Sequence, residues 1–238
     1  MKIGVIGCGT IASAVVEGLA GQGHVIRVSP RSRKRAEALA QQFDEVMIAD
    51  NQDVLNESDV VFLGLMAEHA ADVLTKLHFR PDHKVISLMA GADLPQVRNL
   101  VSPAGTCAIM IPFPNIARGN SPVLTQGDDA LILHLFAPQN QIYPVANAQE
   151  IQSCLAAQAV LSPALKLVNT AETWLDAACP GGVQGFLRHL VASNLEDDTG
   201  VTLQALDTPG GYNQRLRDHM EKSGMSKALT CGLDDLTR

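Results

Sequence analysis

Two glycines and an alanine near the start of the chain have the spacing of a dinucleotide-binding turn. They lie in the run GCGTIA, residues 7–12, directly after an apolar run that predicts a strand and directly before a helical pattern. Gly7 permits the tight turn, Gly9 lets the backbone approach a pyrophosphate, and Ala12 keeps the helix close to the sheet, while the helix N-terminus offers free N–H groups to phosphates. We therefore expect a nicotinamide dinucleotide to contact Gly7, Gly9, Thr10, Ile11 and Ala12.

The end of the second expected strand indicates which dinucleotide binds. NAD-binding proteins place an acidic side chain here, where it binds the ribose hydroxyls. This strand ends at Ser29, and no acidic residue follows before Glu37. A carboxylate would repel a 2′-phosphate, whereas Ser29, Arg31 and Ser32 could donate hydrogen bonds to one, so the sequence predicts NADPH. A solvated helix start with incidental positive charge is the alternative interpretation.

Strands that alternate with helices must position these residues. Apolar runs predict strands at residues 2–7, 24–29, 46–49, 59–66, 84–90, 106–111 and 141–146, and helical patterns lie between them at residues 10–21, 32–43, 53–57 and 68–77. This alternation indicates right-handed βαβ units and a parallel sheet. The fold class is therefore α/β, with a doubly wound Rossmann sheet over residues 1–150. Leu65 and Met66, at the end of the fourth strand, are also expected to contact the cofactor.

The chain changes character after residue 150. Residues 148–178 form a long helical pattern that only Pro163 interrupts, and the pattern stays helical to the end, with breaks at residues 180–182 and 209–211. About ninety helical residues cannot easily enclose a core of their own. We therefore expect residues 151–238 to form a smaller, all-helical dimerisation domain that packs against the first domain or, more favourably, against a second copy in a homodimer or higher homo-oligomer.

The composition argues against several classes of function. A net charge of -7 disfavours a nucleic-acid partner. The five cysteines and seven histidines lack metal-ligand spacing, and an odd cysteine count is unlike a disulfide framework. The apolar N-terminus resembles a secretory signal, but cleavage there would remove the first strand and the glycine turn. We expect a cytoplasmic protein with no metal and no membrane partner.

These motifs resemble the pyrroline-5-carboxylate reductase family. Similar segments are the glycine turn with its third-position alanine, Ser-x-Arg-Ser at residues 29–32, the strand at 59–65, VISLMAG at 85–91, the loop at 112–119, TPGGYN at 208–213 and EKSG at 221–224. The resemblance implies a Rossmann domain, a helical dimerisation domain and NADPH-dependent reduction of a cyclic imine in proline biosynthesis.

The sequence departs from the family where the substrate chemistry should lie. Two serines of the family's SGSGPAY segment correspond to Ala159 and Leu161, which cannot hydrogen-bond a substrate. The threonines of its SPGGTT loop correspond to Tyr212 and Asn213. The substrate is therefore expected to differ from pyrroline-5-carboxylate.

Imine reduction asks the protein to orient the ring, hold its carboxylate and deliver a proton to nitrogen, while the cofactor supplies the hydride. We expect the backbone N–H groups of Gly210 and Gly211 to bind the substrate. Tyr212 could supply the proton, and Asn213 could position the carboxylate. Packing of Tyr212 at a dimer interface is the alternative.

Two other functions stay open. Lys166 and Asn169 lie three residues apart on one helix face and resemble the KxxN of β-hydroxyacid dehydrogenases, in which the lysine acts as general acid and base. The replaced serines also allow a non-catalytic NADP-binding protein that acts as a redox sensor or dimeric scaffold.

Overall fold

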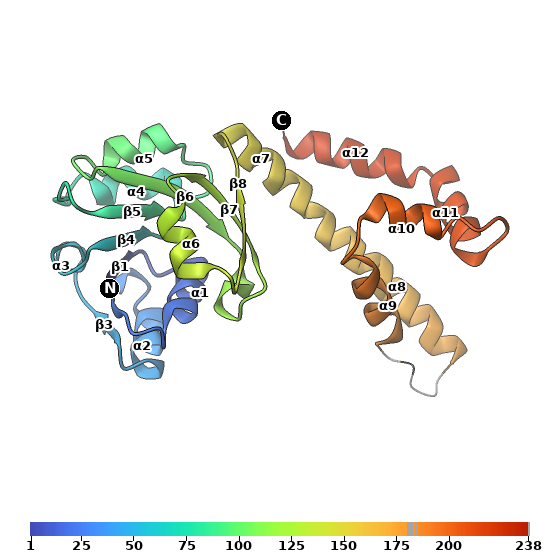
Figure 1. The fold of residues 1–238 in the computed structure, drawn as a ribbon, viewed down its shortest axis with the longest axis horizontal. Helices are drawn as coiled ribbons and strands as arrows, with labels where there is room; N and C mark the ends of the chain where they lie inside the picture. The colour runs from blue at the N-terminus through green and yellow to red at the C-terminus, as the bar shows by residue number, and fades with distance from the viewer. Residues whose placement is uncertain (180–182, 184, 238) are drawn as a thin grey trace. The chain divides into compact units, whose positions relative to one another are not determined.

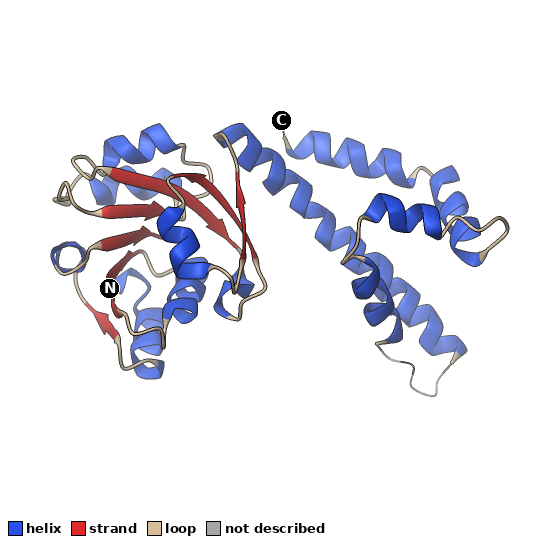
Figure 2. Ribbon diagram, viewed as in Figure 1, coloured by secondary structure: helices blue, strands red, loops and turns tan. Residues whose placement is uncertain are grey.

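The computed structural model describes residues 1–179, 183 and 185–237 (Figure 1). They form two compact units, Met1–Ile151 and Gln152–Arg238. All the strands lie in the first unit, and the second consists of helices joined by loops (Figure 2). The expected fold class, a Rossmann-type α/β sheet followed by an all-helical part, is confirmed.

Eight strands form one sheet in the order β3-β2-β1-β4-β5-β6-β7-β8. The strands are β1 (Lys2–Ile6), β2 (Val25–Val28), β3 (Val46–Ile48), β4 (Val60–Leu63), β5 (Lys84–Ser87), β6 (Thr106–Pro112), β7 (Pro122–Gly127) and β8 (Gln141–Pro144). The first six pair in parallel, as expected. β7, which the sequence patterns did not predict, runs antiparallel to β6, and β8 runs parallel to β7.

Helices cover both faces of the sheet (Figure 1). The first unit contains α1 (Thr10–Leu19), η1 (Pro30–Ser32), α2 (Arg33–Gln42), α3 (Asn51–Asn56), α4 (Ala67–Leu74), α5 (Leu94–Leu100), η2 (Pro114–Ala117) and α6 (Ala130–Phe136). α1 contacts α2, η2 and α6, whereas α4 contacts α5. Because helices lie on both faces, β1 and β4 are apolar almost throughout, and all four residues of β4 are buried.

The strand order reverses between β1 and β4. From β1 the chain continues to β2 on one side, whereas β4 pairs with β1 on the other side. The carboxyl ends of these two strands therefore form the switch point of the sheet, where open α/β sheets bind ligands. The glycine turn follows β1 at this point, and Leu65 and Met66 follow β4.

A helix of 31 residues, Ala148–Ala178, begins the C-terminal part of the chain. It comprises α7 (Ala148–Ala157), a 3-10 turn η3 (Gln158–Val160) and α8 (Leu161–Ala178). Pro163 explains the turn, since its ring crowds the carbonyl four residues earlier and it offers no N–H to that position. By length and composition alone this helix could cross a membrane, and only 6% of its most apolar 18-residue window is buried. One such helix is weak evidence, because buried core helices of soluble proteins meet the same criterion.

The remaining helices are α9 (Phe186–Asn194), α10 (Thr199–Ala205), α11 (Tyr212–Lys222) and α12 (Met225–Leu236). The expected break at residues 209–211 separates α10 from α11, and the one at residues 180–182 lies outside the described residues. Within the described chain, α8 to α12 contain no buried residue. Large apolar side chains such as Leu161, Leu165 and Trp174 are exposed instead, Trp174 by 73%.

Candidate functional site

The glycine turn is fixed by contact between the ends of β1 and β4. Gly7 has a φ of 89°, and a Cβ added to it would lie 2.5 Å from the carbonyl oxygen of Gly64. A Cβ on Gly64 would in turn lie 2.6 Å from the Cβ of Ala12. Only glycine fits at both positions, because the first requires a left-handed backbone and both lack space for a side chain. The turn therefore holds the start of α1 close to the sheet, as expected of Ala12.

The N-terminus of α1 is open. Gly9 is its N-cap residue, no side chain caps the helix, and a Cβ added to Gly9 would meet nothing within 4 Å. The first helical hydrogen bond joins the Ser13 N–H to the Gly9 carbonyl at 2.9 Å, so the preceding N–H groups have no helical acceptor. These groups and the positive end of the helix dipole fit the pyrophosphate of a dinucleotide.

Ser29 is buried against the glycine turn. Its side chain is fully buried, and its Oγ accepts a hydrogen bond from the Gly7 N–H at 2.8 Å. The hydroxyl that the sequence suggested as a phosphate donor therefore faces the turn and not the solvent. In this position Ser29 supports the backbone that makes the turn, and its expected contact with the phosphate stays a prediction.

The basic segment after β2 is exposed. Arg31 and Ser32 lie in η1, with Arg31 exposed and Ser32 partly exposed. Arg33 pairs with Glu37 at 2.8 Å. Arg35, which the sequence analysis did not select, donates from Nη2 to the Thr10 Oγ1 at 3.1 Å. Arg35 belongs to the cluster of basic residues at 31–35, and that cluster is the feature of the sequence that points to it.

Two further expected cofactor residues lie beside the turn. Leu65 is buried, and its Cδ2 lies 2.9 Å from the place that a Cβ on Gly7 would take. Met66 is 60% exposed and is the N-cap residue of α4. Leu65 therefore packs against the buried side of the turn at Gly7, whereas the Met66 side chain is accessible to a ligand.

Cys8, the middle residue of the turn, is buried and lies 3.6 Å from the Ser13 Oγ through its Sγ. Burial raises the pKa of this thiol, against smaller opposing effects of Ser13 and the Arg35 charge. The thiol therefore stays protonated and packs as a small side chain. No group of three or more histidine, cysteine or acidic side chains in the described residues could hold a metal ion.

The loop before α11 is closed by its own hydrogen bonds. Gly210 has a φ of 74°, and its N–H donates to the Gln214 Oε1 at 2.7 Å. The Gly211 N–H donates to the Thr208 carbonyl at 2.9 Å. Binding of a substrate by these two N–H groups would thus have to replace internal partners, of which the partly exposed Gln214 side chain is the more easily displaced.

Tyr212 and Asn213 begin α11. Both are exposed, and the Tyr212 side chain is 89% accessible. Of the residues that replace the family's serines, Ala159 lies in η3, and Leu161 is exposed at the start of α8.

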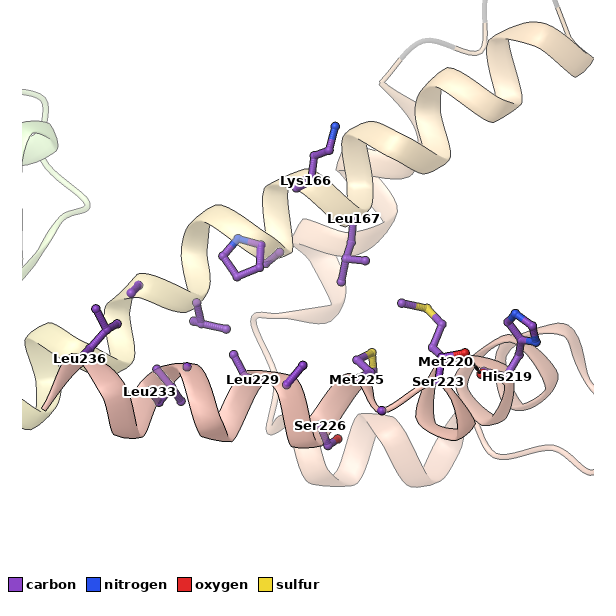
Figure 3. A pocket seen from close by; sticks show the side chains of 17 residues that line it. Lys166, Leu167, His219, Met220, Ser223, Met225, Ser226, Leu229, Leu233 and Leu236 are labelled. Atoms are coloured by element: carbon purple, nitrogen blue, oxygen red, sulfur yellow. Dashed lines mark hydrogen bonds between the residues drawn. The ribbon is translucent and has the colours of Figure 1, made fainter. Parts of the chain in front are cut away.

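A groove of about 890 Å³ runs between α8 and α12 (Figure 3). Its lining is mostly apolar and includes Leu167, Met220, Met225, Leu229, Leu233 and Leu236. Leu167 points toward α12, whereas Lys166 extends away from it (Figure 3). Asn169 lines a different, smaller pocket beside the Arg188–Glu172 ion pair, so the structure does not bring Lys166 and Asn169 to one cavity.

Comparison with known proteins connects these features to reductases. The family model described as "NADP oxidoreductase coenzyme F420-dependent" matches residues 2–91, which include the glycine turn and the ends of β1, β2 and β4. The chain is 24% identical to pyrroline-5-carboxylate reductase 3 from Xenopus laevis over 258 aligned positions, which cover 100% of this chain and 94% of that protein.

Solved structures share the fold over the whole chain. The 1-pyrroline-5-carboxylate reductase from Streptococcus pyogenes matches with a TM-score of 0.81 at 22% identity, covering 100% of this chain and 96% of the other. The pyrroline carboxylate reductase from Plasmodium falciparum, solved with NADP bound, matches with a TM-score of 0.77 at 14% identity, covering 100% and 95%.

Proposed function

We propose that this chain, a divergent member of the pyrroline-5-carboxylate reductase family, reduces the C=N bond of a cyclic imine carboxylate with NADPH. The observation that carries the proposal is the open N-terminus of α1 above the glycine turn, beside a segment that is basic and lacks a carboxylate. This arrangement fits a pyrophosphate and a 2′-phosphate together. Two relatives that match over the full length of this chain, from Xenopus laevis and Streptococcus pyogenes, are pyrroline-5-carboxylate reductases by name.

Bound NADPH would supply a hydride to the imine carbon. The first-turn N–H groups of α1 would hold the pyrophosphate, and Arg31 and Ser32 would contribute to the 2′-phosphate site. Tyr212 would give its phenolic proton to the imine nitrogen, and Asn213 would hold the substrate carboxylate. The exposed position of both side chains at the start of α11 leaves them free for a ligand.

The substrate is proposed to be a ring that does not need the two missing serine hydroxyls. Ala159 and Leu161 offer no side-chain hydrogen bond and present apolar surface, so a less polar ring than pyrroline-5-carboxylate would suit them. Family membership suggests proline biosynthesis, and these replacements point to a relative of that reaction.

A substrate panel tests this function. The purified protein would be mixed with NADPH and cyclic imine carboxylates of five- and six-membered rings, and with NADP⁺ and 3-hydroxy acids. Consumption of NADPH with an imine supports the proposal. Oxidation of a hydroxy acid that Lys166→Ala abolishes would instead favour a β-hydroxyacid dehydrogenase, and tight NADPH binding with no turnover would favour a non-catalytic NADP-binding protein.

The helical part is proposed to associate with a second copy of the chain. Its helices expose many large apolar side chains, and the groove between α8 and α12 is lined by others (Figure 3). Soluble monomers rarely expose apolar surface on this scale. Covering by a second copy would also account for the apolar, exposed helix Ala148–Ala178 in a soluble, cytoplasmic enzyme.

A further inference from the structure

A hydrogen bond between side chains joins the two helices nearest the glycine turn. Arg35 lies in the first turn of α2, and Thr10 is the first residue of α1. The Arg35 Nη2 donates to the Thr10 Oγ1 at 3.1 Å. Thr10 can therefore still donate its own hydroxyl hydrogen, and the guanidinium keeps most of its five N–H groups for another acceptor.

The charge of Arg35 is not neutralised within the described part of the chain. Arg33 is paired with Glu37, and the other ion pairs do not include Arg35. The charge also acts inside the turn, where it lowers the pKa of Cys8 against the larger effect of burial. Arg35 is thus a cation without an acidic partner, held at the rim of the dinucleotide-binding turn.

The position of Arg35 in the fold indicates which part of the dinucleotide it would contact. The segment after β2 is the one that distinguishes ribose hydroxyls from a 2′-phosphate. Ser29 is buried beneath the turn, so of the side chains expected to bind this phosphate, only Arg31 is both charged and exposed. A dianionic phosphate is bound best by more than one charge-assisted donor, which leaves a role for a second cation.

We propose that Arg35, positioned by Thr10, determines the preference for NADPH over NADH by binding the adenosine 2′-phosphate together with Arg31. The inference rests on the proposed function for the dinucleotide, and it adds a residue and a positioning contact to it. Thr10 acts on this preference through Arg35, in addition to its place at the start of α1.

The test measures dissociation constants of NADPH and NADH by nicotinamide fluorescence, and of adenosine 2′,5′-bisphosphate and AMP by calorimetry. Arg35→Gln should weaken NADPH and adenosine 2′,5′-bisphosphate by about 10–100-fold and leave NADH and AMP nearly unchanged. Arg33→Gln is the matched control, since it removes an arginine of the same turn that already pairs with Glu37, and it should change both cofactors by less than about 2-fold.

The positioning role is tested by a double-mutant cycle. Thr10→Val should lower the ratio of the NADH to the NADPH dissociation constant by about 3–10-fold in the wild-type background and should not lower it further in Arg35→Gln. Circular dichroism and thermal unfolding, compared with those of the wild-type protein, show that the variants are folded. Three results would overturn the inference: equal losses of NADPH and NADH affinity in Arg35→Gln, a loss of NADPH affinity in Arg33→Gln as large as that in Arg35→Gln, or additive effects of Thr10→Val and Arg35→Gln.

If wild-type protein binds neither cofactor, the proposed function itself fails, whereas tight NADPH binding that Arg35→Gln leaves intact refutes only this inference.

Discussion

Tyr212 is the residue on which the proposed proton transfer depends. Replacing the phenol by phenylalanine keeps the ring and removes the proton, so Tyr212→Phe should lower kcat by about 10²–10⁴-fold, the usual range for acid–base assistance. The NADPH dissociation constant should not change. Steady-state kinetics with an imine identified by the panel measure both quantities. An unchanged kcat would assign Tyr212 to packing.

Ser29 and Arg31 are expected to behave differently, although both follow β2. Ser29→Ala leaves the buried Gly7 N–H without its acceptor, at a cost of about 1–3 kcal/mol in the free energy of unfolding, and should weaken NADPH and NADH equally. Arg31→Ala should weaken NADPH by about 1–3 kcal/mol with NADH nearly unchanged. Denaturation measures the loss of stability, and cofactor titration measures the loss of affinity. If Ser29→Ala is fully stable and loses affinity for NADPH alone, Ser29 contacts the 2′-phosphate directly, as the sequence suggested.

The residues of the glycine turn could be predicted because their chemistry is local. Gly7 is required by its left-handed backbone and by its close approach to Gly64. The space beside Gly9 is open, as the motif implies for a bound pyrophosphate. Arg35 could not be selected in the same way, because its partner Thr10 is 25 residues earlier and the two meet only when α1 and α2 pack together.

At the scale of elements, Arg80 and His83 join the end of α3 to the start of β5. The Arg80 guanidinium donates to the carbonyls of Leu55, Asn56 and Ser58 at 3.0–3.2 Å. The His83 Nδ1 accepts from the Arg80 N–H at 3.0 Å, and its Nε2 lies 3.1 Å from the Leu55 carbonyl. This pattern requires a neutral imidazole that carries its proton on Nε2.

This histidine predicts a dependence of stability on pH. Burial lowers the pKa of His83, and the Arg80 charge lowers it further. The hydrogen bond to the Leu55 carbonyl and the carboxylates of Asp82 and Asp59 oppose the shift in pKa. The folded state therefore binds this proton less readily than the unfolded state, whose histidine pKa is about 6.5. Stability should be retained above that pH and should fall as the pH drops below it toward the folded pKa.

Urea denaturation at a series of pH values on both sides of the unfolded histidine pKa of about 6.5 measures how the free energy of unfolding depends on pH. His83→Gln removes the titrating group and should flatten the profile below neutrality. His24→Gln is the comparison, because partial burial, the charge of the chain's N-terminus and His134 also lower the pKa of His24. A wild-type profile that is flat in this range would contradict the neutral assignment of His83.

The elements that could be predicted are those with a continuous apolar pattern. The six parallel strands were expected because each is a short run rich in β-branched and other apolar residues. β4 is buried throughout, whereas the edge strand β3 leaves Met47 and Ile48 exposed. β7 begins with Pro122 and pairs antiparallel with β6, so its identity depends on the partner strand more than on its own pattern. α5 was also missed, although its capping box of Asp93 and Gln96 was a readable start signal.

At the scale of the whole molecule, the account predicts a dimer or larger assembly. Sedimentation or solution scattering at micromolar concentration should show at least two copies. Leu167→Glu places a carboxylate in the groove between α8 and α12, where covering by a second copy would bury it unpaired, so association should weaken by at least about 10-fold. The control is Leu133→Glu on α6, an exposed leucine outside that groove. A compact wild-type monomer, or equal dissociation by the control, would contradict the assignment.

The proposed reaction is hydride transfer to a C=N bond, and isotope transfer measures it directly. NADPH deuterated at the transferable C4 position would be incubated with the protein and each cyclic imine carboxylate of the panel, and the product analysed by mass spectrometry. We predict a cyclic amine that carries a single deuterium on the former imine carbon, at one configuration. Absence of deuterated amine from every imine, with NADPH bound and the protein folded, would contradict the account.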